Sequence, residues 1–182
     1  MVCSFFISKM KGVGKIATTG IWKIEKRLDN VIDYTTNIEK TINSDYGKDS
    51  YYDLHNVIDY VEADYKTEKQ FYVSGVNCNP KTALEEMTIT KEQYGKTGGI
   101  LGFHAFQSFA EGEVTPEQCH AIGVRLAEEM WGDRFEVVVS THLNTNHYHN
   151  HFVINSVSFK DGKRYYDKRE TYAELRRVSD SL

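Results

Sequence analysis

The chain has 182 residues, of which 40% are hydrophobic and 26% charged. This length and composition fit one globular domain with a buried core, and they exclude a disordered or fibrous protein. The longest apolar runs are too short to cross a bilayer, and residues 3–7 are too short for a signal-peptide core, so we expect a cytoplasmic protein without a membrane partner. The three cysteines lack CxxC spacing, which excludes a disulfide framework or a thiolate zinc site.

The formal net charge of −4 argues mildly against nucleic-acid binding, which normally requires a basic surface. The average hides an asymmetry along the chain. Residues 1–27 carry six cations against one anion, whereas residues 28–69 carry ten anions against four cations. Charge runs are usually solvated faces, so this pattern carries little weight alone.

Residues 1–16 show no hydrophobic period and read as a loose leader, so one domain is expected over 17–182. Residues 17–24 are predicted to be a strand, followed by a helix from about residue 25. The segment 28–34 nearly repeats at 54–60, which predicts two similar helices ending in Tyr34 and Tyr60.

Alternating side chains predict a strand over 70–77, and Asn79-Pro80 opens a helix that reaches about residue 94. A strand is expected over 100–109. Thr115-Pro116 begins a helix that ends at Gly132, with the cap and first-turn proline in place.

Two β-branched, aromatic-rich runs, 134–143 and 151–159, predict two strands joined by a seven-residue connection. A last helix begins near Arg169 and is cut off at Leu182, which suggests a piece of a longer protein. The order of elements predicts an α+β fold with a central, mainly antiparallel sheet of about five strands and helices packed on it.

Four of the seven histidines lie within residues 142–151. His149 and His151 are two residues apart, so on a strand they point to one face, and His142 sits at the facing end of the neighbouring strand. Three imidazoles with positions left open for water or substrate are typical of a catalytic metal site. The alternative is a set of surface-loop histidines or an adventitious nickel-binding patch, which convergent strand parity disfavours. His147 stays open as an outer residue or a DNA contact.

Imidazole ligands suit zinc, manganese, nickel or copper better than magnesium, which prefers oxygen. Mn²⁺ or Mg²⁺ still fits if phosphate oxygens and waters fill the open positions. The ion would polarise a phosphoryl oxygen, which leaves water or a side-chain hydroxyl as the nucleophile. Among twelve tyrosines, Tyr34 and Tyr60 are placed for this role at the ends of matching helices, and a phenol, which ionises near pH 10, needs a metal or base nearby.

The pattern His142-x6-His149-x-His151 resembles the metal motif of the relaxases, the mobilization nucleases of the HUH endonuclease superfamily, in their MOBP class. Segments 31–41, 73–78, 103–117 and 149–155 support the resemblance, which covers nearly the whole chain from about residue 18. It is most similar to relaxases of integrative conjugative elements in Gram-positive bacteria.

The resemblance implies an enzyme that binds one strand of an origin of transfer and attacks a scissile phosphate with a tyrosine. The products are a 5′-phosphotyrosine link and a free 3′-hydroxyl, and the reverse reaction rejoins the ends. It implies a relaxosome accessory protein and a coupling protein as partners. The implied site is Tyr34 as nucleophile with Tyr60 as runner-up, metal ligands His142, His149 and His151, and DNA contacts at Ser108, Asn144, His147, Lys23 and Arg27.

This chain departs from the family pattern at Asn144, where relatives often have an aspartate. Asp33 or Glu113 would have to replace that carboxylate. Rival interpretations are a rolling-circle replication initiator with the same metal trio, a non-catalytic origin-binding module, and a metal-storage or sensor domain.

Overall fold

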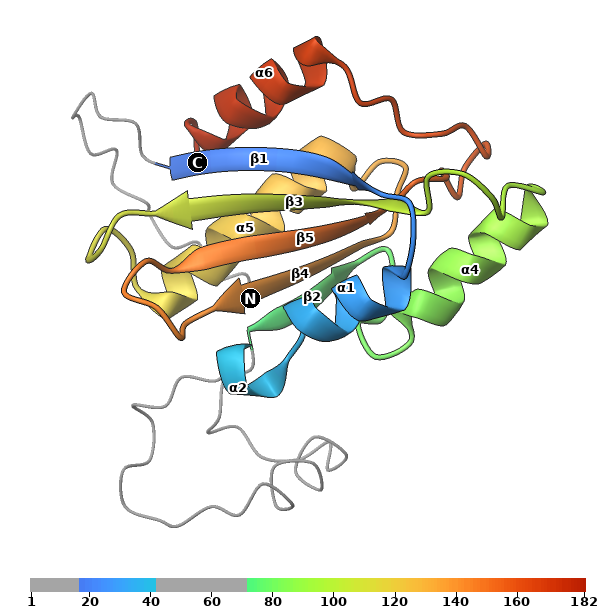
Figure 1. The fold of residues 1–182 in the computed structure, drawn as a ribbon. Helices are drawn as coiled ribbons and strands as arrows, with labels where there is room; N and C mark the ends of the chain where they lie inside the picture. The colour runs from blue at the N-terminus through green and yellow to red at the C-terminus, as the bar shows by residue number, and fades with distance from the viewer. Residues whose placement is uncertain (1–16, 42–71) are drawn as a thin grey trace, which may run out of the picture.

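The computed structural model describes residues 17–41 and 72–182 (Figure 1). Its elements in chain order are β1 (Ala17–Ile24), α1 (Leu28–Thr35), α2 (Ile38–Thr41), β2 (Val73–Val76), α4 (Ala83–Gln93), β3 (Gly102–Phe109), α5 (Pro116–Trp131), β4 (Val137–His142), β5 (His149–Asn155) and α6 (Arg169–Ser179). The expected leader 1–16 and the second repeat helix with Tyr60 lie outside the described residues.

The five strands form one sheet in the order β1-β3-β5-β4-β2, and every neighbouring pair is antiparallel. The helices pack on this sheet (Figure 1), so the predicted α+β fold with about five antiparallel strands is confirmed. No helix in the described ranges is long and apolar enough to cross a membrane.

The bounds of the last two strands differ from the predicted ranges, 134–143 and 151–159, at both ends of the sheet. β5 starts at His149 instead of His151, because His149 pairs with His142 on one side and with Ser108 on the other. It ends at Asn155, beyond which Val157 makes only an isolated bridge to Arg164. The hairpin connection is therefore six residues long, and all three candidate ligands lie on strands.

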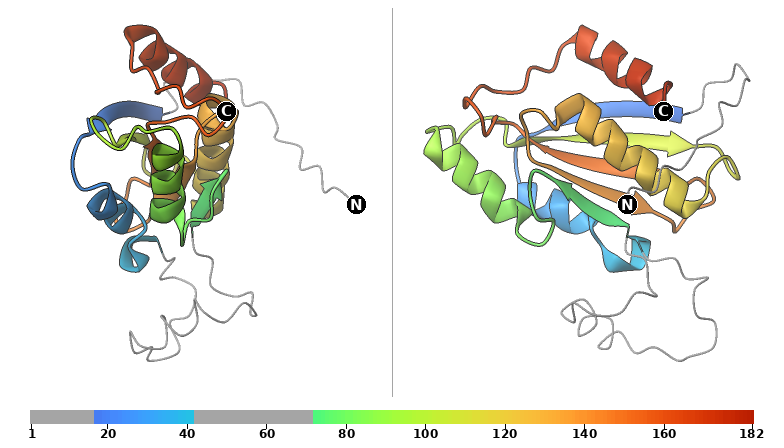
Figure 2. Two further views of the ribbon diagram at one scale, coloured as in Figure 1. Left: turned by 90° about the vertical axis from the view of Figure 1, so that its right-hand side faces the viewer. Right: turned by 180° about the vertical axis from the view of Figure 1, so that it is seen from behind.

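One face of the sheet is covered by α5, with α6 beside it over β1 (Figure 2). The amphipathic spacing of α5 directs Cys119, Gly123, Leu126, Ala127 and Trp131 inward. At its start, Thr115 and Gln118 form a capping box in which each side chain accepts from the other residue's backbone N–H. This face holds the main core of the domain.

Among the described residues, α1 and α4 cover part of the opposite face. Leu28 and Ile32 of α1 and Met87 of α4 pack there on Ile24 and on Val138 and Val153. These contacts lie toward the end of the sheet where β1 ends and β4 begins, while α2 lies against β4 at the other end. His142, which is buried, and His149, which is partly exposed, lie at that other end.

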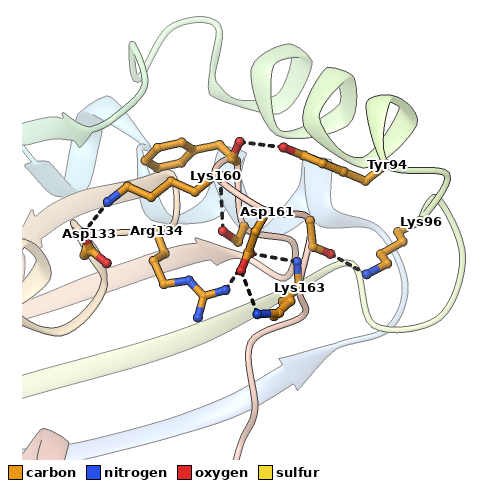
Figure 3. Close-up of polar contacts among 10 residues, drawn as sticks. Tyr94, Lys96, Asp133, Arg134, Lys160, Asp161 and Lys163 are labelled. Carbon is orange, nitrogen blue, oxygen red and sulfur yellow. Dashed lines mark hydrogen bonds and ion pairs between the residues drawn. The ribbon is translucent and has the colours of Figure 1, made fainter.

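Ionic and hydrogen-bonded contacts fix the turn beyond β5 (Figure 3). Asp161 forms an ion pair with Arg134 at 2.6 Å and accepts the backbone N–H of Lys163, and these contacts lower the pKa of its carboxyl group. Tyr94, just after α4, donates its hydroxyl to the carbonyl of Phe159 at 2.9 Å. The turn thus joins α4 to the end of the sheet remote from the histidines.

Candidate metal centre

The three predicted ligands converge on one face of the β4–β5 hairpin. His142 lies opposite His149 in the antiparallel register, and His151 follows two residues along the same strand. Ring centroids are separated by 4.3 Å for His142 and His151, by 5.0 Å for His149 and His151, and by 5.2 Å for His142 and His149. One nitrogen from each ring lies within 4.8 Å of the other two, a spacing that suits one divalent ion.

Each ring uses one nitrogen for the protein and keeps the other for a ligand. The Nε2–H of His142 donates to the Thr35 carbonyl at 2.9 Å, and the Nδ1–H of His149 donates to the His147 carbonyl at 2.9 Å. In His151, Nδ1 contacts His104, whereas Nε2 is buried and has no hydrogen-bond partner among residues 17–41 and 72–182. The free atoms are therefore Nδ1 of His142 and Nε2 of His149 and His151, and the orphaned Nε2 fits a metal ligand.

His104 is a buried histidine that the sequence analysis did not single out. Its Nε2 lies 2.8 Å from Nδ1 of His151, and its exposed fraction is 7%. If Nε2 of His151 presents its lone pair to a metal, Nδ1 carries the proton and donates it to His104. His104 then fixes both the tautomer and the ring orientation of a ligand.

Burial keeps these rings neutral. Desolvation lowers the pKa of His104 and of His142 to about 4 and that of His151 to about 2, with a further lowering by the neighbouring histidines. Neutral imidazoles have free lone pairs, so protons do not compete with a metal at His142 and His151 near neutral pH. The donor set therefore fits a divalent transition metal.

Tyr34, the predicted nucleophile, lies beside this centre. Its ring centroid is 5.7 Å from that of His142 and 6.0 Å from that of His151, and the side chain is 52% exposed. The next residue, Thr35, supplies the carbonyl that accepts a hydrogen bond from His142, so the same backbone holds both the tyrosine and a candidate ligand. A substrate arriving from solvent can reach the phenol.

Lys40 of α2 adds a positive charge that was not predicted. Its Nζ lies 3.4 Å from the centroid of the Tyr34 ring, a cation–π contact. Its carbonyl accepts the backbone N–H of Leu143 at 2.7 Å, which joins α2 to the end of β4. The ammonium can offset negative charge on a phosphate held at the histidines.

The other predicted contacts near the hairpin have different surroundings. Ser108 pairs with His149 across the sheet and lines a cavity of about 250 Å³ together with Thr18, Glu113 and His147. Asn144 is exposed on the hairpin. Among the described residues, no carboxylate joins the histidine cluster. Glu113 instead accepts the backbone N–H of Ala110.

Lys23 lies near the end of β1 that is remote from the histidines, and Arg27 follows that strand. Lys23 pairs with Phe103, at the end of β3 remote from Ser108. Arg27 precedes α1, at the helix end opposite Tyr34, and its guanidinium binds Asp29 at 2.9 Å. The structure does not bring these two cations to the histidines.

A buried polar network supports the hairpin from the other face of the sheet. Asn150 lies between His149 and His151 in the sequence, and its amide donates to Gln107 at 3.0 Å and to the Cys119 carbonyl at 2.8 Å. It accepts from Thr141, the residue before His142, at 2.6 Å. The complete chain of side-chain hydrogen bonds runs through Ser74, His120, Thr141, Asn150, Gln107 and Ser179. It links four strands and two helices around the ligand positions.

Comparison with known proteins gives one family match and several relatives. The model of the family "Relaxase: MobA/VirD2-like, nuclease domain" matches residues 36–182. "Protein rlx" of Staphylococcus aureus is 39% identical over 109 residues, which are 60% of this chain and 33% of that protein. "Group II intron-interrupted relaxase LtrB" of Lactococcus lactis subsp. cremoris is 32% identical over 166 residues, 77% of this chain and 29% of that protein. The chain thus spans about a third of the length of these relatives.

Proposed function

This chain belongs to the relaxase family as a MobA/VirD2-like nuclease domain, and from this premise we propose that it nicks one strand of DNA at an origin of transfer and later rejoins it. The family membership confirms the resemblance inferred from the sequence. The observation that carries the proposal is the convergence of three free imidazole nitrogens beside the exposed phenol of Tyr34.

We assign His142, His149 and His151 as ligands of a divalent ion, Mn²⁺ or Mg²⁺, completed by water and phosphate oxygens. The bound ion would polarise a phosphoryl oxygen and offset the charge that develops at phosphorus. The three rings are held in orientation because the second nitrogen of each ring is bound by the protein, at Thr35, His147 and His104. Origin DNA, a relaxosome accessory protein and a coupling protein are the proposed partners.

Tyr34 attacks the scissile phosphate in this mechanism. A bond forms between the phenol oxygen and phosphorus, the bond from phosphorus to the 3′-oxygen breaks, and that oxygen takes up a proton. The proton of the phenol passes to water, which reaches the half-exposed side chain. The products are a 5′-phosphotyrosyl link and a 3′-hydroxyl, and attack by that hydroxyl reverses the reaction.

The test is covalent capture. The protein is incubated with labelled single-stranded DNA from the origin of transfer of its own element and with Mn²⁺ or Mg²⁺, and the products are separated under denaturing conditions. We expect a protein–DNA adduct that requires the metal. Without an adduct in either metal, the strand-transfer proposal fails, and the non-catalytic origin-binding interpretation takes its place.

Two matched variants identify the nucleophile. Tyr34→Phe removes only the hydroxyl and should abolish the adduct, while Tyr60→Phe should form it as the wild type does. The opposite pattern would assign the reaction to Tyr60.

A further inference from the structure

An aromatic surface adjoins the histidines on the face of the sheet opposite α5. Trp22 of β1 pairs with His104 of β3, and Phe106 of β3 pairs with His151 of β5. Directly paired residues point to the same side of a sheet, so both aromatic rings share the face of the metal ligands. Trp22 is 45% exposed and Phe106 is half-buried.

The rings form a continuous layer. The Trp22 centroid lies 4.4 Å from that of His104 and 5.9 Å from that of Phe106. His104 in turn lies 4.9 Å from His151, so Trp22 is two ring contacts away from a metal ligand. A Cβ built on Gly20 would lie 2.4 Å from a carbon of the Phe106 ring, so the glycine lets that ring lie over β1.

We propose that Trp22 and Phe106 form a stacking platform for an unpaired base of the DNA strand next to the scissile phosphate. This inference rests on the proposed function, because the phosphate at the histidines is what brings the strand to this face. A flat base fits an exposed indole, and stacking on aromatic side chains tolerates any base. Bases inside a duplex cannot reach the platform, so it would select single-stranded DNA.

The platform gives a spectroscopic readout that does not depend on cleavage. The chain contains only two tryptophans, and Trp131 is buried at 1% exposure. Binding of a short, mixed-sequence single-stranded DNA in EDTA should therefore quench the emission of Trp22. The duplex of the same sequence should quench it much less.

Variants measure the contribution to affinity. Trp22→Leu should weaken metal-free binding of that single strand about 5- to 100-fold, whereas Trp22→Phe, which keeps a stacking ring, should lose much less. Tyr166→Leu is the matched control, because Tyr166 is 71% exposed on the connection between β5 and α6. It should bind as the wild type does. Circular dichroism and thermal melting establish that each variant is folded.

The outcomes separate this inference from the proposed function. If Trp22→Leu binds the single strand as tightly as the wild type, or if quenching is absent on binding, the platform is wrong even where an adduct forms. If the wild type binds in a Trp22-dependent way but forms no adduct with any metal, stacking of single-stranded DNA on Trp22 stands, and the strand-transfer proposal falls together with the place next to a scissile phosphate. Equal dependence of duplex and single-strand binding on Trp22 would also overturn the platform.

Discussion

At the residue scale, the site depends on which nitrogen of each imidazole is free. Strand alternation predicted that three histidines would share a face, since it needs only local sequence. It could not predict that Thr35, His147 and His104 would bind the other ring nitrogens. The Thr35 carbonyl and His104 are far from their partners in the sequence, so these two contacts depend on tertiary packing, whereas the His147 carbonyl is a local contact within the hairpin.

His104 offers the sharpest test of this arrangement. His104→Leu removes the acceptor for Nδ1 of His151 and should weaken Mn²⁺ binding about 10- to 100-fold. His104→Gln keeps an acceptor oxygen and should lose less. Titration of Mn²⁺ followed by electron paramagnetic resonance measures the affinity directly. Wild-type affinity in a folded Leu variant would show that His104 does not position the ligand.

Burial of His120 should make the folded protein less stable in acid. Burial lowers its pKa to about 4, below the value of about 6.5 in the unfolded chain. The unfolded state therefore binds a proton first as the pH falls, so stability is retained above about pH 6.5 and lost toward pH 4. For His120 alone, the free energy of unfolding should fall by about 2 to 3 kcal/mol over this pH range.

The measurement is the free energy of unfolding across that pH range, in EDTA. Other buried histidines add to the loss in the wild type, so the comparison is with His120→Gln, which cannot take up the proton. Its loss should be smaller by about 2 kcal/mol. His147→Gln, a change at an exposed histidine, should follow the wild-type curve. Parallel curves for the wild type and His120→Gln would refute this assignment.

At the element scale, α5 packs directly against β5, the strand that carries two of the proposed metal ligands. Gly123 faces Asn150, and a Cβ at Gly123 would lie 2.5 Å from the amide nitrogen of that side chain. Asn150 cannot move freely, because it is bound by Thr141, Gln107 and the Cys119 carbonyl. The sequence predicted the helix but gave no sign of this contact, since a glycine inside a helix has no single structural meaning.

Gly123→Ala should therefore destabilise the protein. Alanine favours a helix over glycine by about 1 kcal/mol, but overpacking costs about 1 to 3 kcal/mol and here also disturbs a buried polar network. We expect a net loss of about 1 to 2 kcal/mol in denaturant unfolding, with weaker Mn²⁺ binding because the flanking ligands shift. Gly98→Ala is the control, since no atom of the described part of the chain lies within 4 Å of its added Cβ. A Gly123→Ala protein as stable as Gly98→Ala would contradict the packing argument.

At the scale of the whole molecule, the number and pairing direction of the strands were predicted better than the residues at which the strands begin and end. Hydrophobic alternation fixed the strands and the α+β class. The start of β5 was predicted two residues too late because His149 and Asn150 look like hairpin residues locally. Their pairing with Ser108 and Gln107 of β3, more than forty residues earlier, brings them into the sheet. Such long-range register follows from tertiary packing and not from local propensity.

The histidine centre should also stabilise the whole domain. A metal that binds only the folded state adds RT ln(1 + [M]/Kd), which is about 2.7 kcal/mol at a hundredfold excess over Kd. Mn²⁺ should therefore raise the melting temperature, and EDTA should reverse the rise.

His151→Ala removes the orphaned Nε2 and should abolish the shift. His147→Ala should retain it, because His147 supports His149 through its backbone carbonyl and not through its ring. Since the unfolded chain also holds histidines that bind metal weakly, the rise should level off at high Mn²⁺ in the wild type, and His151→Ala should show no rise at any Mn²⁺ concentration. An equal rise in both proteins would mean that the metal acts elsewhere.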